Sequence, residues 1–266
     1  MENKKNGRFI KAGDVVIFKS NTEGLDYNLE KNTVYTIEID RYTDSISLKI
    51  NSELSLPTKI YNTTENNKFI KKVLNHEKIS TDGVTGVMLS GLKGSGKTVM
   101  MKQIASESNL PIILVDKGFR PSMLKKLFSL LQETECCFVF DEIDKLGEDY
   151  DDTYLLQVLD GAATAGKHLA VFTCNDESEI NDCLKDRCSR IHYWKRFGEM
   201  PNSMILSILK DNLKDAKKIA ETAQFIQKNF AVISFDNVVS FVNEINNYPE
   251  ESLDELFNDM NLSKRR

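Results

Sequence analysis

One short stretch of the chain gathers the residues that phosphate chemistry needs. The pattern G-x-x-x-x-G-K-[ST] is matched at each defined position by Gly91-Leu92-Lys93-Gly94-Ser95-Gly96-Lys97-Thr98. Glycines let backbone N–H groups turn toward a triphosphate, and a helix that begins at the loop directs the positive end of its dipole there. Lys97 adds an ammonium group, and Thr98 adds a hydroxyl that can ligate Mg²⁺. We predict that residues 91–99 bind a nucleotide; a glycine-rich loop that ends in Lys-Thr by chance is the alternative.

Two acidic residues follow a second apolar run. The run is Cys136-Cys137-Phe138-Val139-Phe140, which is typical of a buried strand, and Asp141 and Glu142 come directly after it. Asp141 can hold Mg²⁺ through water, and Glu142 can polarise the water that attacks a terminal phosphate. Two acids after a strand are also a common start of a helix. Their order and distance after the phosphate loop favour the catalytic interpretation.

Both motifs need strands that deliver them to one edge of a sheet. A short apolar run at 86–90 precedes the phosphate loop, and after it Val99, Met100, Ile104 and Ala105 recur at helical spacing. Further strands are expected at 111–116, 136–140, 168–174 and 190–194, alternating with helices at 121–131, 153–159 and 178–185. This alternation predicts a three-layer α/β fold, in which helices cover both faces of a parallel sheet and ligands bind at the carboxyl ends of its strands.

The segments on either side read differently. Short alternating runs at 14–18, 33–39 and 45–50 predict a small antiparallel β-barrel, possibly SH3-like, over residues 1–61. A linker and a short amphipathic helix follow at 62–78, and the nucleotide-binding core is expected at 79–199. Residues 200–266 read as helices, the last of which begins at a capping box, Ser252-Leu253-Asp254-Glu255.

Composition describes an ordinary globular chain of 266 residues with a formal net charge of -5. No apolar run approaches the ~18 residues that a membrane span needs, and no signal peptide is recognisable, so we expect a cytoplasmic protein. The five cysteines form no C-x-x-C pair, and the three histidines are scattered. Basic residues cluster at Lys4, Lys5, Arg8 and Lys11 and at Lys68, Lys71 and Lys72, where a solvated face is the simpler interpretation and local nucleic-acid binding the other.

Four blocks in order resemble the AAA+ ATPases, in particular the AAA clade in the narrow sense. The blocks are Asp141-Glu142-Ile143-Asp144, residues 155–161, Thr173-Cys174-Asn175 and Asp186-Arg187-Cys188-Ser189-Arg190, and the resemblance covers residues 86–196. It implies that ATP and Mg²⁺ are the cofactors and that Asn175 is the sensor residue that positions water with Glu142. It also implies that Arg187 and Arg190 are arginine fingers for a neighbouring subunit, and that the protein is a homo-oligomer, a hexameric ring with a C-terminal helical lid. A polar strand end or a salt-bridged surface arginine would be the simpler roles.

The resemblance leaves the substrate open. The usual Pro-Pro of the loop is Leu92-Lys93 here, and the aromatic pore signature is missing, so that Phe119 is either a pore-loop candidate or a residue packed under the next helix. Adenine contacts are expected from residues 80–83 and the lid. We expect ATP-driven remodelling or movement of a macromolecular partner, protein rather than nucleic acid. A DNA-linked loader or processing motor, or a nucleotide-switched scaffold with negligible turnover, are the alternatives. The Lys/Asn/Ile-rich composition fits the small members found in bacteriophages.

Overall fold

The computed structural model describes residues 8–19, 28–40, 42–51, 54–80, 83–116, 119, 123–145, 159, 166–180, 182–185 and 191–265. Its strands are β1 (Arg8–Ala12), β2 (Val15–Lys19), β3 (Val34–Ile39), β4 (Ile46–Asn51), β5 (Gly83–Gly91), β6 (Ile112–Leu114), β7 (Cys136–Phe140), β8 (Lys167–Cys174) and β9 (Tyr193–Phe197). Its helices are α1 (Thr64–Ile79), α2 (Lys97–Glu107), α3 (Leu124–Leu130), α5 (Asp182–Lys185), α6 (Asn202–Asn212), α7 (Ile219–Asn229), α8 (Phe235–Asn247) and α9 (Leu253–Asp259). Within these ranges, every helix is too short or too polar to span a membrane.

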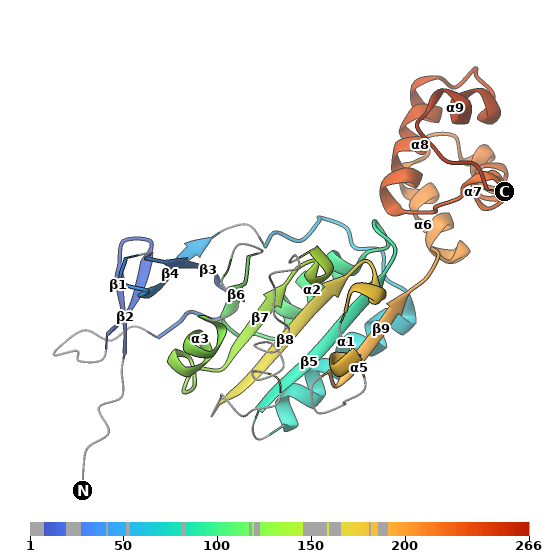
Figure 1. Cartoon of the computed structure of the whole chain (residues 1–266). Helices are drawn as coiled ribbons and strands as arrows, with labels where there is room; N and C mark the ends of the chain where they lie inside the picture. Colours follow the sequence, from blue (N-terminus) through green and yellow to red (C-terminus); the bar gives the residue numbers. More distant parts are fainter. Residues whose placement is uncertain are drawn as a thin grey trace, which may run out of the picture.

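A parallel sheet forms the middle of the molecule. Its strands lie in the order β6-β7-β8-β5-β9, and each neighbouring pair is parallel. Because all five residues of β7 are buried, this strand is apolar throughout rather than alternating. The predicted P-loop α/β fold is therefore confirmed, and the phosphate loop and the acids after β7 both lie at the carboxyl edge (Figure 1).

Helices cover the two faces of this sheet. On one face, α1 and α2 pack through Ile70, Val73 and Ile104 against β-strand residues such as Leu89 and Val171. The other face carries α3, with apolar side chains from Leu124 to Phe128 packed against Phe138 and Phe172. The phosphate-loop helix is thus held between the loop and a buried core, which fixes its amino end at the carboxyl edge.

The N-terminal strands extend the central sheet instead of standing apart from it. They follow the order β1-β2-β4-β3 with antiparallel pairs, and β3 then pairs in parallel with β6, joining Val34, Tyr35 and Thr36 to residues 112–114. We expected a small barrel here, whereas the described strands form an open nine-stranded sheet with the core. The physical reason is that β3 occupies the edge that β6 would otherwise expose, and the apolar side chains of these strands belong to the same buried cluster as α3.

The C-terminal helices form a unit with its own core. Helices α6 to α9 bury a cluster that includes Ile208, Ile226, Phe230 and Phe241. Figure 1 shows this unit beyond β9, next to the carboxyl edge of the sheet. The capping box expected at Ser252 is confirmed, because its side chain and that of Glu255 each bond the other's backbone N–H. The helix predicted at 153–159 falls outside the described residues except for Leu159, which is buried.

Candidate nucleotide-binding site

The phosphate loop passes so close to two other segments, at Phe197 and at Ser234, that only glycine fits at the two contact points. Gly91 has a φ of 132°, and a Cβ placed on it would lie 2.1 Å from the carbonyl oxygen of Phe197 in β9. Gly94 has a φ of 75°, and a Cβ there would lie 2.8 Å from the Cβ of Ser234, the N-cap of α8. The backbone N–H of Phe235 also donates to the carbonyl oxygen of Gly94 at 3.2 Å. The loop is therefore fixed at its start by the sheet and at its middle by the C-terminal unit.

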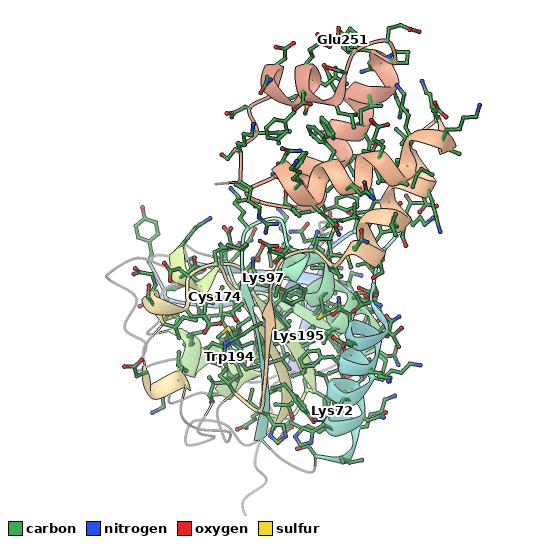
Figure 2. All side chains as sticks on the ribbon, turned by 90° about the vertical axis from the view of Figure 1, so that its right-hand side faces the viewer. Lys72, Lys97, Cys174, Trp194, Lys195 and Glu251 are labelled. Atoms are coloured by element: carbon green, nitrogen blue, oxygen red, sulfur yellow. The ribbon has the colours of Figure 1, made fainter. Side chains whose placement is uncertain are left out.

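Lys97 is the first residue of α2 and is buried at the site. Its Nζ donates to the carbonyl oxygens of Gly91 and Leu92, at 2.7 Å each. Burial lowers the pKa of Lys97, while Asp144, Cys174, Asp141 and Glu142 oppose that shift. Figure 2 shows Lys97 just below the C-terminal helices. The ammonium group thus lies inside the curve of the loop, where phosphate oxygens can replace the two carbonyl oxygens as its hydrogen-bond acceptors.

Thr98 and Asp141, the two residues predicted to hold Mg²⁺, lie side by side. Their closest atoms, Thr98 Oγ1 and Asp141 Oδ1, are 3.3 Å apart. The hydroxyl of Thr173, on β8, donates to the same carboxylate oxygen at 2.5 Å. A hydroxyl and a carboxylate side by side form the oxygen donor set that Mg²⁺ prefers. These residues fit Mg²⁺, which would be held by Thr98 directly and by Asp141 through water and would supply charge neutralisation on the phosphates.

Glu142 is held in an unusual backbone conformation beside Asn175. Its φ is 54°, in the left-handed region that is strained for a non-glycine residue. The backbone N–H of Glu142 donates to Thr173 Oγ1 at 2.7 Å, and its Oε1 accepts from Asn175 Nδ2 at 3.1 Å and from Lys145 Nζ at 2.8 Å. The predicted water-polarising acid and sensor residue are therefore in direct contact. Arg187 and Arg190 lie outside the described residues.

A pocket of about 360 Å³ continues from the phosphate loop toward the C-terminal unit. Its far wall combines the segment 57–62, which precedes α1, with Met200, Met204 and Phe235. The ring centroids of Tyr61 and Phe235 are 5.6 Å apart. Our expectation of adenine contacts from the C-terminal helices fits this wall, but the expectation for residues 80–83 does not. Gly83 begins β5 and the phosphate loop ends it, so the two are separated by roughly 25 Å of extended chain.

Several of the residues that shape the site were not singled out from the sequence. Thr173 and Ser90 are polar residues directly after apolar runs near the carboxyl ends of their strands, and that position is a signal that could mark them. Lys145 lies three residues after Glu142, which is a helical spacing for a salt bridge. Nothing local marks Tyr61 or Ser234, because their roles depend on contacts between distant segments.

Phe119 is buried in the protein. Only 6% of its surface is exposed, and it belongs to the cluster that also contains Met123 and Leu124 at the start of α3. Packing under the next helix, one of the two roles weighed for this residue, is the one that the structure describes.

Comparison with known proteins gives a family for the part of the chain that carries this site. A family model described as "ATPase family associated with various cellular activities (AAA)" matches residues 87–196. The chain is 28% identical to the mitochondrial inner membrane m-AAA protease component yta12 of Schizosaccharomyces pombe over an alignment of 190 residues, which covers 63% of this chain and 24% of that protein.

Two further relatives share shorter segments. One is the 26S proteasome regulatory subunit 7 homolog of Schizosaccharomyces pombe, 29% identical over 46% of this chain and 32% of its own length. The other is the ATP-dependent zinc metalloprotease FtsH 3 of Phytoplasma mali, 34% identical over 32% of this chain and 16% of its own length. The chain thus spans less than a third of the length of each curated relative named here.

Proposed function

Since residues 87–196 match the AAA ATPase family, we propose that this chain hydrolyses ATP with Mg²⁺ and works as a homo-oligomeric, hexameric ring that remodels or moves a protein partner. The observation that carries the proposal is the contact of Glu142 with Asn175 beside the phosphate loop, at 3.1 Å. A carboxylate oriented by an amide is suited to position and deprotonate water next to a terminal phosphate.

Each residue near the loop has a separate task in this proposal. Lys97 exchanges its two carbonyl partners for phosphate oxygens, and the turned backbone N–H groups of residues 94–98 bind the remaining ones. Glu142 takes the proton of the attacking water while Asn175 holds its carboxylate in place. Thr173 keeps Asp141 and the backbone of Glu142 in fixed relation through two hydrogen bonds.

The proposed ring explains why the chain needs more than its own site. Negative charge spreads over the transferred phosphoryl group in the transition state, and a guanidinium offers planar donors that always carry a charge to meet it. We assign this task to Arg187 and Arg190 of the adjacent subunit. An arginine supplied in this way can contribute about 10³–10⁵ in rate, so an isolated subunit should be a poor ATPase.

Protein is the favoured partner for two reasons. The relatives include components named as proteases and a proteasome regulatory subunit, and the chain is acidic, with a formal net charge of -5. One observation favours DNA as the second candidate: Lys68, Lys71 and Lys72 are exposed on the outer face of α1. A steep fall of DNA affinity with salt, or stimulation of turnover by DNA, would distinguish that candidate. The cytoplasmic location and the bacteriophage source stay predictions from the sequence.

The test is steady-state ATP hydrolysis by the assembled protein, with and without DNA and candidate protein substrates. Glu142→Gln keeps the size of the side chain but removes the base, so we expect ATP binding to persist and turnover to fall at least about a hundredfold. Arg187→Ala should bind ATP and assemble, yet lose most turnover. Parental hydrolysis rates in Glu142→Gln would overturn the assignment, and parental rates in assembled Arg187→Ala would overturn the role of the neighbouring subunit.

A further inference from the structure

A polar network next to the phosphate loop joins β5, β9 and the short 3₁₀ helix Glu177–Glu179 that follows β8. Ser90 is fully buried and immediately precedes Gly91. Its hydroxyl donates to Glu177 Oε1 at 2.5 Å and accepts from the indole Nε1 of Trp194 at 2.8 Å. In the sheet, Ser90 is aligned with Cys174 of β8 on one side and with Arg196 of β9 on the other. One hydroxyl thus connects the strand of the phosphate loop to β9 and to the segment that follows β8.

Glu177 and Arg196 close the network. The Nε of Arg196 donates to both carboxylate oxygens of Glu177, at 3.0 and 3.1 Å. The guanidinium of Arg196 lies 5.1 Å from the centre of the Trp194 ring. Burial alone would raise the pKa of Glu177, but hydrogen bonds from Ser90 and Arg196 outweigh it and leave the pKa below its ordinary value. The carboxylate therefore stays ionised and bound at neutral pH.

The network stands where nucleotide binding, water positioning and the C-terminal unit converge. Glu177 follows Asn175 by two residues. Arg196 precedes Phe197, whose carbonyl oxygen lies where a side chain at position 91 would otherwise be. From Phe197 the chain continues to Met200, in the wall of the pocket, and into α6. Figure 2 shows Trp194 on the side of β9 near Cys174, while Lys195 lies on the other side, over Phe69.

From this geometry we infer that Glu177 and Arg196 are positioning residues for ATP hydrolysis. They fix the relative positions of three segments: the start of the phosphate loop, the segment after β8 that carries Asn175, and the end of β9 that leads to the C-terminal unit. The inference rests on the proposed ATPase function and adds the residues that align its site. Arg196 is largely exposed, with 67% of its side-chain surface accessible. An exposed ion pair contributes little to global stability, so the network should affect turnover much more than unfolding.

The experiment compares the parental protein with Glu177→Gln, Arg196→Ala, Arg196→Lys and the double variant Glu177→Gln/Arg196→Ala. Misplacement of reacting groups by a fraction of an ångström up to 1 Å costs up to about a hundredfold in rate. We expect Glu177→Gln to lower kcat by about ten- to a hundredfold, with the dissociation constant for ATP within about threefold of the parental value. Arg196→Lys, which keeps the charge but not the two-oxygen contact, should have a kcat between those of Arg196→Ala and the parental protein. The double variant should be no worse than the more damaged single variant, because the two residues act as a unit.

A matched control is Glu38→Gln, which removes an exposed carboxylate whose partner Lys49 lies 3.7 Å away in the N-terminal sheet. This variant should hydrolyse ATP at the parental rate. The inference is overturned by a parental kcat in Glu177→Gln, by additive losses in the double variant, or by an equal loss in Glu38→Gln.

A second measurement separates this inference from the proposed function. If the parental protein shows no turnover that depends on Glu142, the proposed function fails by itself. Hydrogen–deuterium exchange then decides the inference: Glu177→Gln should speed exchange at residues 90–95 and 197–200 relative to both the parental protein and Glu38→Gln. Unchanged exchange in those segments overturns the inference.

Discussion

At the scale of single residues, the site depends on where side chains are missing as well as where they are present. Gly94 combines a φ of 75° with a Cβ position 2.8 Å from Ser234. An L-residue in the left-handed region costs about 1 kcal/mol, and the contact with Ser234 adds to that cost. The absence of a side chain at Gly94 therefore sets both the turn of the loop and its distance from α8.

Gly94→Ala should weaken ATP binding by at least about tenfold, because the loop must either straighten or move away from α8. Ser234→Gly in the same chain should recover part of the loss, since it removes the contact but not the backbone strain, and glycine is tolerated at an N-cap. Isothermal titration with ATP measures both. The control is Gly13→Ala, which has a similar φ of 62° but nothing within 4 Å of the added Cβ. Gly13→Ala should cost stability alone, and an equal loss of ATP affinity there would contradict the explanation.

At the scale of elements, the segment 57–62 acts as one wall of the nucleotide pocket and as an attachment for the C-terminal unit. The hydroxyl of Tyr61 accepts from Asn212 Nδ2 at 3.2 Å, and Lys59 pairs with Asp211 at 2.6 Å. Both partners lie at the end of α6. A short stretch without regular structure thus connects the pocket wall to the first helix of the unit that closes over it.

Tyr61→Ala should weaken ATP binding by roughly three- to tenfold, because an aromatic pair with Phe235 contributes about 0.5–1.5 kcal/mol beyond its buried area. Tyr61→Phe keeps the ring and loses the hydroxyl contacts with Asn212 and Asp211, which lie outside the ring pair, so its affinity should stay near the parental value. Tyr42→Ala removes a fully exposed tyrosine and serves as the control. A parental affinity in Tyr61→Ala would show that the ring does not line the nucleotide site.

Elements whose pattern is local could be predicted, and contacts between distant elements could not. Strand β7 is a purely apolar run that matches its prediction residue for residue, and the capping box at Ser252 is written in four consecutive positions. Strand β1 lies outside the strands that the sequence predicts. The pairing of β3 with β6 joins segments about 80 residues apart and has no local signature. The same holds for the pocket wall at Tyr61. Tyr61 precedes the first residue of α1, whereas residues 80–83, from which the sequence predicts adenine contacts, follow its last residue.

At the scale of the whole molecule, one continuous sheet joins the N-terminal strands to the nucleotide-binding core, so a change in the core should affect the stability of both. His168, on β8, packs edge-on against the stacked rings of Phe128 and Phe138, with ring centroids 5.4 and 5.2 Å away. Both of its ring nitrogens are buried, and neither has a hydrogen-bond partner in the described part of the chain. Burial lowers the pKa of His168 from 6.5 to about 4. Protonation therefore favours the unfolded chain.

The free energy of unfolding should carry this residue's full contribution above pH 6.5 and lose it as the pH falls toward 4. A shift of this size corresponds to about 3 kcal/mol over that window. His168→Phe, which can pack against the same two rings, should flatten this part of the pH dependence. Urea unfolding at pH 7.5, 6 and 5, followed by the fluorescence of the single tryptophan, Trp194, measures the difference. Identical slopes for the parental protein and His168→Phe would contradict the assignment.

The order of strands in the sheet also governs how the protein emerges during synthesis. Strand β5, which carries the phosphate loop, has β8 and β9 as its only partners within the described sheet. The end of β8 is translated roughly 80 residues after Gly91, which takes about 4–16 s at the usual speed of a ribosome. Strand β3 likewise waits for β6. Three strand edges, two of β5 and one of β3, are thus unpaired on the nascent chain for seconds. The phosphate loop gains its shape only when most of the protein has been made.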